Sequence, residues 1–242
     1  MTPTTTTNTT AAKANTKTKT VFQKAPFRVL ATLLLIEGVM VGQVLSRPSA
    51  PEDCNKITDA KLRVACWVKK VKAGEKHLSK ADLHGAILAM MDLEGADFHG
   101  ANLRGAELSG ADLDGANLRG AHLEGAHLTV TDLEGAHLEG AYLNKANLDT
   151  AHLEGAHLER AHLTSANLSN ADLKKAHLEG ADLHGANLTK AKLQQANLSG
   201  ADLRGADLND ANLTGANVTG IKIDKDTKDK NMRGHPPFNM RI

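Results

Sequence analysis

Residues 101–115 read ANLRG AELSG ADLDG, three successive five-residue units with the same layout. The unit continues in both directions without an insertion or deletion, so that residues 76–225 divide into 30 pentads. The central position is Leu in 27 pentads, with Phe98, Val218 and Ile223 as exceptions, and the first position is Ala in 26. Self-similarity at a fixed period indicates a repeat architecture, in which each unit buries its apolar residues against its neighbours.

A period of five matches neither the 3.6 of a helix nor a sustained alternation of two, so the chain must turn regularly. Ala and Leu are two residues apart, which places both on one face of a short extended segment. The fifth position is Gly in 17 pentads and suits a bend. Because Val130 and Thr150 also occupy it, we expect that a positive φ is not obligatory there.

This layout resembles the pentapeptide-repeat family, whose pattern is A-[D/N]-L-x-x. Residues 101–105 (ANLRG) and 111–115 (ADLDG) carry the pattern unchanged, and the resemblance covers 150 of the 242 residues. It implies an all-β solenoid, a right-handed quadrilateral β-helix with four pentads in each coil; the period of five alone does not fix the number of sides. Stacked at ~4.8 Å, seven and a half coils would form a rod roughly 36 Å long.

The composition agrees with an aliphatic interior. Aromatic residues make up 2% of the chain, too few for an ordinary globular core, whereas each buried Leu contributes about 1.5–3 kcal/mol. Two cysteines cannot build a disulfide-dense scaffold or a four-thiolate zinc site. A rod filled by Ala and Leu also offers no pocket where a nucleophile and a base could converge, so we predict no enzyme activity and no cofactor.

The first 46 residues indicate targeting. Residues 1–28 form a Thr- and Lys-rich leader, expected to be disordered, and residues 29–46 form an apolar segment interrupted by Glu37. Three interpretations stay open: a cleaved secretory signal, an uncleaved anchor that tethers the protein to a membrane, and an organelle import sequence or buried helix. We expect an exported protein, periplasmic or extracellular, or a membrane-anchored one, with an organelle lumen or the cytoplasm as the alternative.

Residues 47–75 are expected to form a linker and a short capping helix. From Ile57 to Val71, apolar residues recur at spacings of three and four, which predicts an amphipathic helix. It would cover the first coil, whose outward positions carry Ile87, Met90 and Met91. A disulfide between Cys54 and Cys66 is attractive in an oxidising compartment, but twelve helical residues span ~18 Å, and a bridge needs Cα atoms within about 7 Å. Either the helix starts late or the bond is absent.

A carboxylate stripe is the first candidate interaction surface. If residues 20 apart stack, one side of the rod carries seven acids in four successive coils: Asp92, Glu94, Asp112, Asp114, Asp132, Glu134 and Glu154. Like charges at ~4.8 Å repel, so the stripe would favour a cationic partner or divalent ions. The alternative is that Asp simply suits the position before Leu.

A histidine ladder is the second candidate site. His137, His157 and His177 would stack on the next side, with Glu139, Glu159 and Glu179 beside them. Imidazoles at this spacing could share a metal ion or take up protons together. The alternative is a solvated surface on which Asp, Asn and His interchange freely.

These features favour a non-enzymatic structural or protein-interaction rod, exported or membrane-tethered. The competing hypotheses are an acidic DNA mimic that binds a topoisomerase, which the repeat charge of −8 favours and the basic first 75 residues disfavour, and a metal-binding surface on the histidine ladder. The sequence leaves the protein partner unidentified and disfavours nucleic acid. Residues 226–242 form a C-terminal tail that would either cover the last coil or leave it free for an end-to-end homodimer; residues 29–46, if uncleaved, would contact a membrane.

Overall fold

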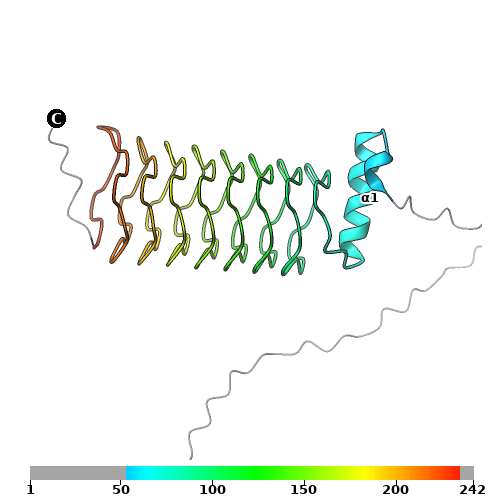
Figure 1. Ribbon diagram of the computed structural model, residues 1–242, viewed down its shortest axis with the longest axis horizontal. Coiled ribbons are helices and arrows are strands. Elements are labelled where there is room, and N and C mark those ends of the chain that lie inside the picture. The colour runs from blue at the N-terminus through cyan, green and yellow to red at the C-terminus, as the bar shows by residue number, and fades with distance from the viewer. Residues whose placement is uncertain (1–52, 235–242) are drawn as a thin grey trace, which may run out of the picture. The chain divides into compact units, whose positions relative to one another are not determined.

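The structure is a computed structural model that describes residues 53–234. A 3-10 helix, η1 (Cys54–Lys56), and an α-helix, α1 (Ala60–Lys72), come first. They are followed by a stack of coils, with α1 at its N-terminal end (Figure 1). In the described range the coils contain isolated parallel bridges rather than extended strands, one bridging residue on each side of a coil.

The bridges fix the number of sides at four. Each second residue of a pentad pairs with the residue 20 positions later, as in Asp82 with Asn102 and Asn102 with His122. The amide of Leu83 donates to the Asn102 carbonyl at 2.8 Å, and the Asn102 amide donates back to the Ala81 carbonyl at 2.9 Å. Since each side contributes five residues, a 20-residue coil has four sides, and residues 20 apart lie one above the other.

The interior is almost entirely aliphatic. The Ala and Leu positions of the pentads are almost completely buried from Leu78 to Leu213 and form one continuous core. Phe98 fits into a Leu position. Thr131 occupies an Ala position, where its Oγ1 donates to the Leu108 carbonyl at 2.9 Å. The buried hydroxyl therefore keeps a hydrogen-bond partner, as a polar group in such a core must.

The corners correct one expectation. Every fifth position from residue 80 to residue 220 has a positive φ, whether or not it is glycine. Val130 has φ +58° and Thr150 has φ +57°, so the expectation that a positive φ is not required there was wrong. The amide after each corner donates to the Leu carbonyl three residues earlier, as Ala86 does to Leu83 at 3.0 Å. Such a turn needs a left-handed third residue, and closure of the coil imposes it on any side chain.

Asp and Asn at the second pentad position also have a structural role. Their side chains accept the amide two residues later, as Asp112 does from Asp114 and Asn187 does from Thr189. That amide lies at the corner, where a short polar side chain provides an acceptor without lengthening the turn. The preference for Asp before Leu is thus partly explained by the backbone, whereas the fourth position carries no such requirement.

The coil continues past the last regular pentad. Asp202 still pairs with Lys222, but Asp207 pairs with Lys228 and Asn212 with Arg233, 21 residues later. Asp224 absorbs the extra residue, because its Oδ1 accepts from the amides of Gly205 and Asp226 at 2.9 and 3.0 Å. The predicted boundary between repeats and tail at residue 225 is therefore too early.

Helix α1 starts three residues later than the pattern from Ile57 to Val71 predicts. Asp59 is its N-cap and accepts from the Leu62 amide at 2.9 Å, which sets the start. Trp67 and Val71 belong to the same buried cluster as Leu78, so α1 packs against the first coil. Arg63 also pairs with Asp82 at 3.0 Å.

The apolar residues of the first coil are only partly covered by this packing. Met91 lies in an inward pentad position and packs against the core. In contrast, Ile87 and Met90 remain exposed. The expectation that the helix would cover all three was wrong, because Ile87 and Met90 lie on an outward side of the coil and not at its open end.

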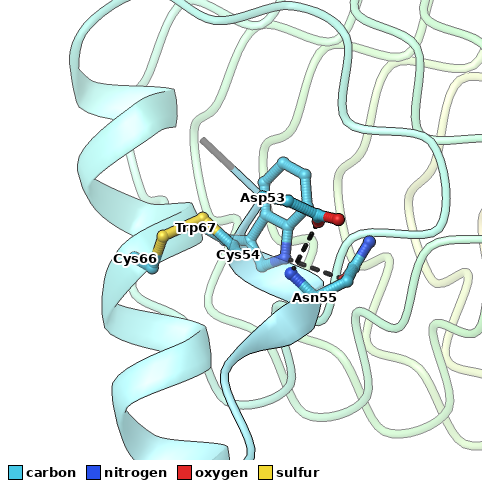
Figure 2. The surroundings of a disulfide bond; sticks show 5 residues. All are labelled: Asp53, Cys54, Asn55, Cys66 and Trp67. Carbon is cyan, nitrogen blue, oxygen red and sulfur yellow. Dashed lines mark hydrogen bonds between the residues drawn. A yellow bond between two sulfur atoms is a disulfide. The ribbon is translucent and has the colours of Figure 1, made fainter. Parts of the chain in front are cut away.

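Cys54 and Cys66 form a disulfide with a Cα–Cα distance of 5.7 Å (Figure 2). A single helix from Cys54 to Cys66 would have held the two Cα atoms too far apart for a disulfide. Because α1 starts only at Ala60, the chain turns between η1 and α1, and Cys54 lies beside the middle of α1. Asn55 also accepts a hydrogen bond from Trp67 Nε1 at 3.4 Å (Figure 2). Two links thus fasten η1 to the helix that contacts the coils.

The leader and apolar segment predicted in residues 1–46 lie outside the described residues, as does the tail from residue 235. Within residues 53–234, no helix combines the length and the apolar character needed to cross a bilayer.

Candidate functional site

The structure aligns the predicted carboxylates on one side of the rod, here called the acidic side and formed by the pentads starting at residues 91, 111, 131 and 151. Asp92 pairs with Asp112, and Asp112 pairs with Asp132. The fourth-position acids of the same pentads, Glu94, Asp114, Glu134 and Glu154, follow the same 20-residue register. All seven predicted acids are therefore brought onto one side.

Cations neutralise only the two ends of this stripe. Lys76 Nζ lies 2.8 Å from Asp92 Oδ1, and Lys175 Nζ lies 2.8 Å from Glu154 Oε1. The Lys76 ammonium lowers the pKa of the Asp92 carboxyl by hydrogen bonding and charge. Within residues 53–234, no ion pair joins the acids between these ends: Glu94, Asp112, Asp114, Asp132 and Glu134.

An apolar groove adjoins the acidic side. It lies along the preceding side, in the pentads starting at residues 86, 106 and 126, and has a volume of about 650 Å³. Its lining comes from the fourth and fifth positions of these pentads: Ala89, Met90, Ser109, Gly110, Thr129 and Val130. Met90 is 80% exposed and Val130 is 54% exposed, and Ile87 of the same side is 73% exposed. We call these lining residues the corner groove.

The corner groove was not predicted, although its signal is present in the sequence. Met90, Gly110 and Val130 are 20 residues apart and therefore share one corner. Gly110 lies between the two apolar residues, and the Met90 side chain lies over it. Only glycine leaves room for this, since a Cβ added at Gly110 would collide with Met90 Sδ. The first residues of the acidic pentads follow this corner directly, so the groove borders the carboxylates along the chain.

The predicted histidine ladder lies on the side here called the histidine side, in the pentads starting at residues 136, 156 and 176. The rings of His137 and His157 stack with centroids 4.9 Å apart, and those of His157 and His177 with centroids 4.7 Å apart. Glu159 Oε1 lies 3.2 Å from His157 Nδ1, and the corresponding distance from Glu179 to His177 is 3.6 Å. The three histidines thus meet their glutamates within one continuous cluster.

His137 differs from the other two members of the ladder. Arg119 Nη2 lies 2.7 Å from His137 Nδ1 and 2.9 Å from Glu139 Oε1. Burial opposes ionisation of Glu139, but hydrogen bonds from its own amide, from His137 and from Arg119, together with the guanidinium charge, leave its pKa below the usual value. The N-terminal member of the ladder, His137, and its neighbour Glu139 are therefore already paired with a cation.

A second stack of rings was not anticipated. His122, Tyr142 and His162 lie on the side that follows the histidine side, with ring centroids 4.8 Å apart and almost parallel planes. The 20-residue spacing of these three residues was the available signal. Stacking stabilises such rings along the rod, and their edges face outward.

Comparison with known proteins identifies the repeats. Residues 77–220 match the family model described as pentapeptide repeats, with eight copies. No curated protein is significantly similar to this chain. Among solved structures, a pentapeptide repeat protein (Rfr23) from the cyanobacterium Cyanothece 51142 is 48% identical, with a TM-score of 0.38. That match covers 38% of this chain and 63% of the cyanobacterial protein, so the chain spans less than two thirds of its length.

Two further structures are similar. A pentapeptide repeat protein from the thylakoid lumen of Arabidopsis thaliana is 37% identical over 45% of this chain and 72% of its own, with a TM-score of 0.26. A trypsin-treated variant of QnrB1, a plasmid-mediated fluoroquinolone resistance protein, is 21% identical. That match covers 62% of this chain and 86% of QnrB1, with a TM-score of 0.55, and it indicates a shared fold.

Proposed function

The chain belongs to the pentapeptide-repeat family, and from that premise we propose that it is an exported, non-catalytic rod that binds a protein partner along one corner. The rod is right-handed and four-sided, with α1 as the cap of its N-terminal end. The partner is a segment that combines Lys or Arg with apolar side chains. It lies along the corner groove and the acidic side.

One observation carries this proposal: unpaired carboxylates border an exposed apolar groove. Asp114 and Glu134 have no ion pair within the described residues, and Met90 and Val130 lie at the adjoining corner. Carboxylates spaced at ~4.8 Å repel one another, and cationic side chains would relieve that repulsion. Apolar side chains of the same segment would meanwhile remove Met90 and Val130 from water.

Neither half of this surface is needed for the fold. The second-position acids accept corner amides, but the fourth-position acids Asp114 and Glu134 do not. Val130 is β-branched and occupies a left-handed corner that glycine fills in most pentads, an arrangement that costs free energy. Strain of this kind is a reason to suspect a role in binding.

The absence of catalysis is supported by the chemistry of the groove. Its lining of Ala, Met, Ser, Gly, Thr and Val contains no side chain that could act as a general base near neutral pH. The coil interior in the described residues is filled by Ala and Leu, with Phe98 and Thr131 as buried exceptions.

Export is supported by the Cys54–Cys66 disulfide and by the basic and apolar leader of residues 1–46. Disulfides persist in oxidising compartments and are rare where thiols are kept reduced. We propose a location in the periplasm, outside the cell or in an organelle lumen, with residues 29–46 either cleaved or retained as a membrane tether. Cell fractionation followed by N-terminal sequencing and thiol titration tests this: a cytoplasmic, uncleaved protein with two free thiols would contradict it.

The DNA-mimic hypothesis is the alternative. Its support is the negative charge of the repeats and the fold shared with QnrB1. The distribution of charge disfavours it, because the acidic stripe ends after four coils and Lys174, Lys175 and Lys192 follow it. A cytoplasmic location together with inhibition of DNA supercoiling by a type II topoisomerase would favour this alternative.

Binding is tested with synthetic peptides on the full chain. We expect a peptide of alternating Lys and Leu to bind, with affinity that falls as salt rises, and a Lys–Ser peptide of equal charge to bind at least tenfold more weakly. Met90→Lys with Val130→Lys, and Asp114→Lys with Glu134→Lys, should each weaken binding at least tenfold. These variants should fold, because Lys already occupies the equivalent positions of later coils: Lys190 aligns with Met90 and Val130, and Lys174 aligns with Asp114 and Glu134.

The matched control is Asn170→Lys with Asp210→Lys, which adds charge to the same corner in later coils and should change affinity less than twofold. Equal binding of both peptides, or equal loss in the control, would overturn the proposed surface. Sedimentation velocity adds a further outcome: a wild-type dimer that the Met90 and Val130 variant converts to a monomer would mean that a second copy occupies the groove.

A further inference from the structure

The side of α1 that does not contact the coils is basic. Trp67 and Val71 are buried against the first coil. The exposed residues of the helix recur at spacings of three and four on its other side, as expected for one face of a helix. We call this face the cap face, and it consists of Lys61, Leu62, Ala65, Lys69 and Lys72.

The positive charge of the cap face is not neutralised within residues 53–234. In that range no ion pair joins Lys61, Lys69 or Lys72 to a carboxylate, whereas Arg63 pairs with Asp82. Helix α1 contains five Lys or Arg residues and no Asp or Glu. The cap is therefore opposite in sign to the repeats, whose net charge is −8.

Helix stability explains only part of this charge. Lys69 and Lys72 lie in the last turn, where cations interact favourably with the helix dipole. Lys61 lies in the first turn, where a cation is unfavourable, and the neighbouring Leu62 is 63% exposed. Lysines around an exposed apolar side chain suit a surface of anionic lipid headgroups, which attracts the charges and shelters the apolar group from water.

The chain that precedes α1 favours a membrane as the partner. The apolar segment of residues 29–46 ends seven residues before Asp53, and seven residues extend less than about 25 Å. The inference rests on the proposed retention of this segment as a membrane tether, which would keep the cap face close to the headgroups. A weak electrostatic contact is then sufficient, because the tether raises the effective concentration of lipid at the cap face.

We propose that the cap face docks on a surface of anionic lipid headgroups, with its three lysines close to the lipid phosphates and Leu62 at the interface. The same surface repels the acidic repeats. Because α1 lies at the N-terminal end of the stack (Figure 1), contact is confined to that end of the rod. The rod then stands away from the membrane and presents the corner groove and the acidic side to solvent.

The test is co-sedimentation of the full chain with vesicles, either of phosphatidylcholine alone or of equal parts of phosphatidylcholine and phosphatidylglycerol. Phosphatidylglycerol should strengthen binding, and added salt should remove that gain. A triple variant, Lys61→Gln with Lys69→Gln and Lys72→Gln, should reduce the gain at least about tenfold, since each lysine near an anionic surface contributes about fivefold. Binding to phosphatidylcholine alone, which measures the contribution of residues 29–46, should be the same in all variants.

The matched control is Lys145→Gln with Lys190→Gln and Lys222→Gln. It removes the same charge from the coils and should keep the gain within about twofold of wild type, because these lysines lie far from the cap face. Trp67 is the single tryptophan of the chain, so its fluorescence shows whether α1 remains packed in each variant.

The absence of a gain from phosphatidylglycerol, or an equal loss in the control, would overturn the proposal. Soluble heparin that binds as tightly as the vesicles, and is lost in the same triple variant, would assign the cap face to a soluble polyanion and would overturn it as well. Binding of the Lys–Leu peptide to the corner groove should be unchanged in the triple variant. Failure of membrane docking and failure of the proposed partner surface are therefore distinguishable.

Discussion

The corner conformation makes a prediction whose size follows from the structure. Gly120 has φ +59°, and a Cβ added there would have no atom within 4 Å. Gly120→Val therefore introduces strain without a collision. A left-handed conformation costs a residue with a Cβ about 1–2 kcal/mol, and the reduced entropy of the unfolded chain offsets about 0.4–1 kcal/mol of that. We expect a net loss of about 1 kcal/mol in the free energy of unfolding.

Urea unfolding followed by circular dichroism measures this loss as a lower midpoint with an unchanged slope. Gly120→Asn is the control, because Asn tolerates the left-handed region and occupies equivalent corners at Asn170 and Asn231; it should lose less than Gly120→Val. If Gly120→Val were as stable as the wild type, the claim that coil closure imposes a positive φ on every corner would be refuted.

Three other predictions concern the core, the cap and the surface. Leu143→Ala should lower the free energy of unfolding by about 2–5 kcal/mol, because Leu143 is fully buried among stacked Leu residues; a loss below about 1 kcal/mol in urea unfolding would contradict the packing. Cys54→Ser with Cys66→Ser should destabilise the cap by about 2–3 kcal/mol and speed hydrogen exchange in α1 while the coils keep their protection; unchanged exchange in α1 would contradict this. The Arg204 hydrogen bond and charge lower the pKa of Asp202 to about 2, so the stabilisation from this pair is present above pH 3.8, the ordinary value, and is lost as the pH falls through about 2. Carboxyl NMR titration should find that low pKa in the wild type and a higher pKa in Arg204→Ala, which keeps only the hydrogen bond from the amide of residue 204 and the charge of Lys222; equal values in both proteins would refute the pairing.

The sequence predicted the core because the burial of Ala and Leu depends on the side-chain period alone, whereas the 20-residue register also depended on the resemblance to the pentapeptide-repeat family, which supplied the four sides. Ala at the first position and Leu at the third lie two residues apart and must share a face, and once four pentads make a coil the uninterrupted pentads align residues 20 apart. The alignment of Asp92 with Asp112, and of His137 with His157, follows directly from that register.

Features that depend on backbone closure or on irregular contacts could not be predicted in the same way. The β-branched side chain of Val130 suggested that the fifth position does not need a positive φ, but the closure of the coil imposes a positive φ there. The start of α1 depends on the Asp59 cap, which outweighed the apolar pattern beginning at Ile57. The difference between His137 and His157 depends on Arg119, which lies in the preceding coil.

Distances between spin labels test the central claim, that residues 20 apart lie one above the other along a four-sided rod. Cys54 and Cys66 are bonded to each other, so labels on cysteines introduced at Ser109, Thr189 and Asn209 report only on the coils. Ser109 and Thr189 are four coils apart and should give about 19 Å, and Ser109 and Asn209 are five coils apart and should give about 24 Å. Distances that do not rise with the number of coils would contradict the stacking and the surfaces inferred from it.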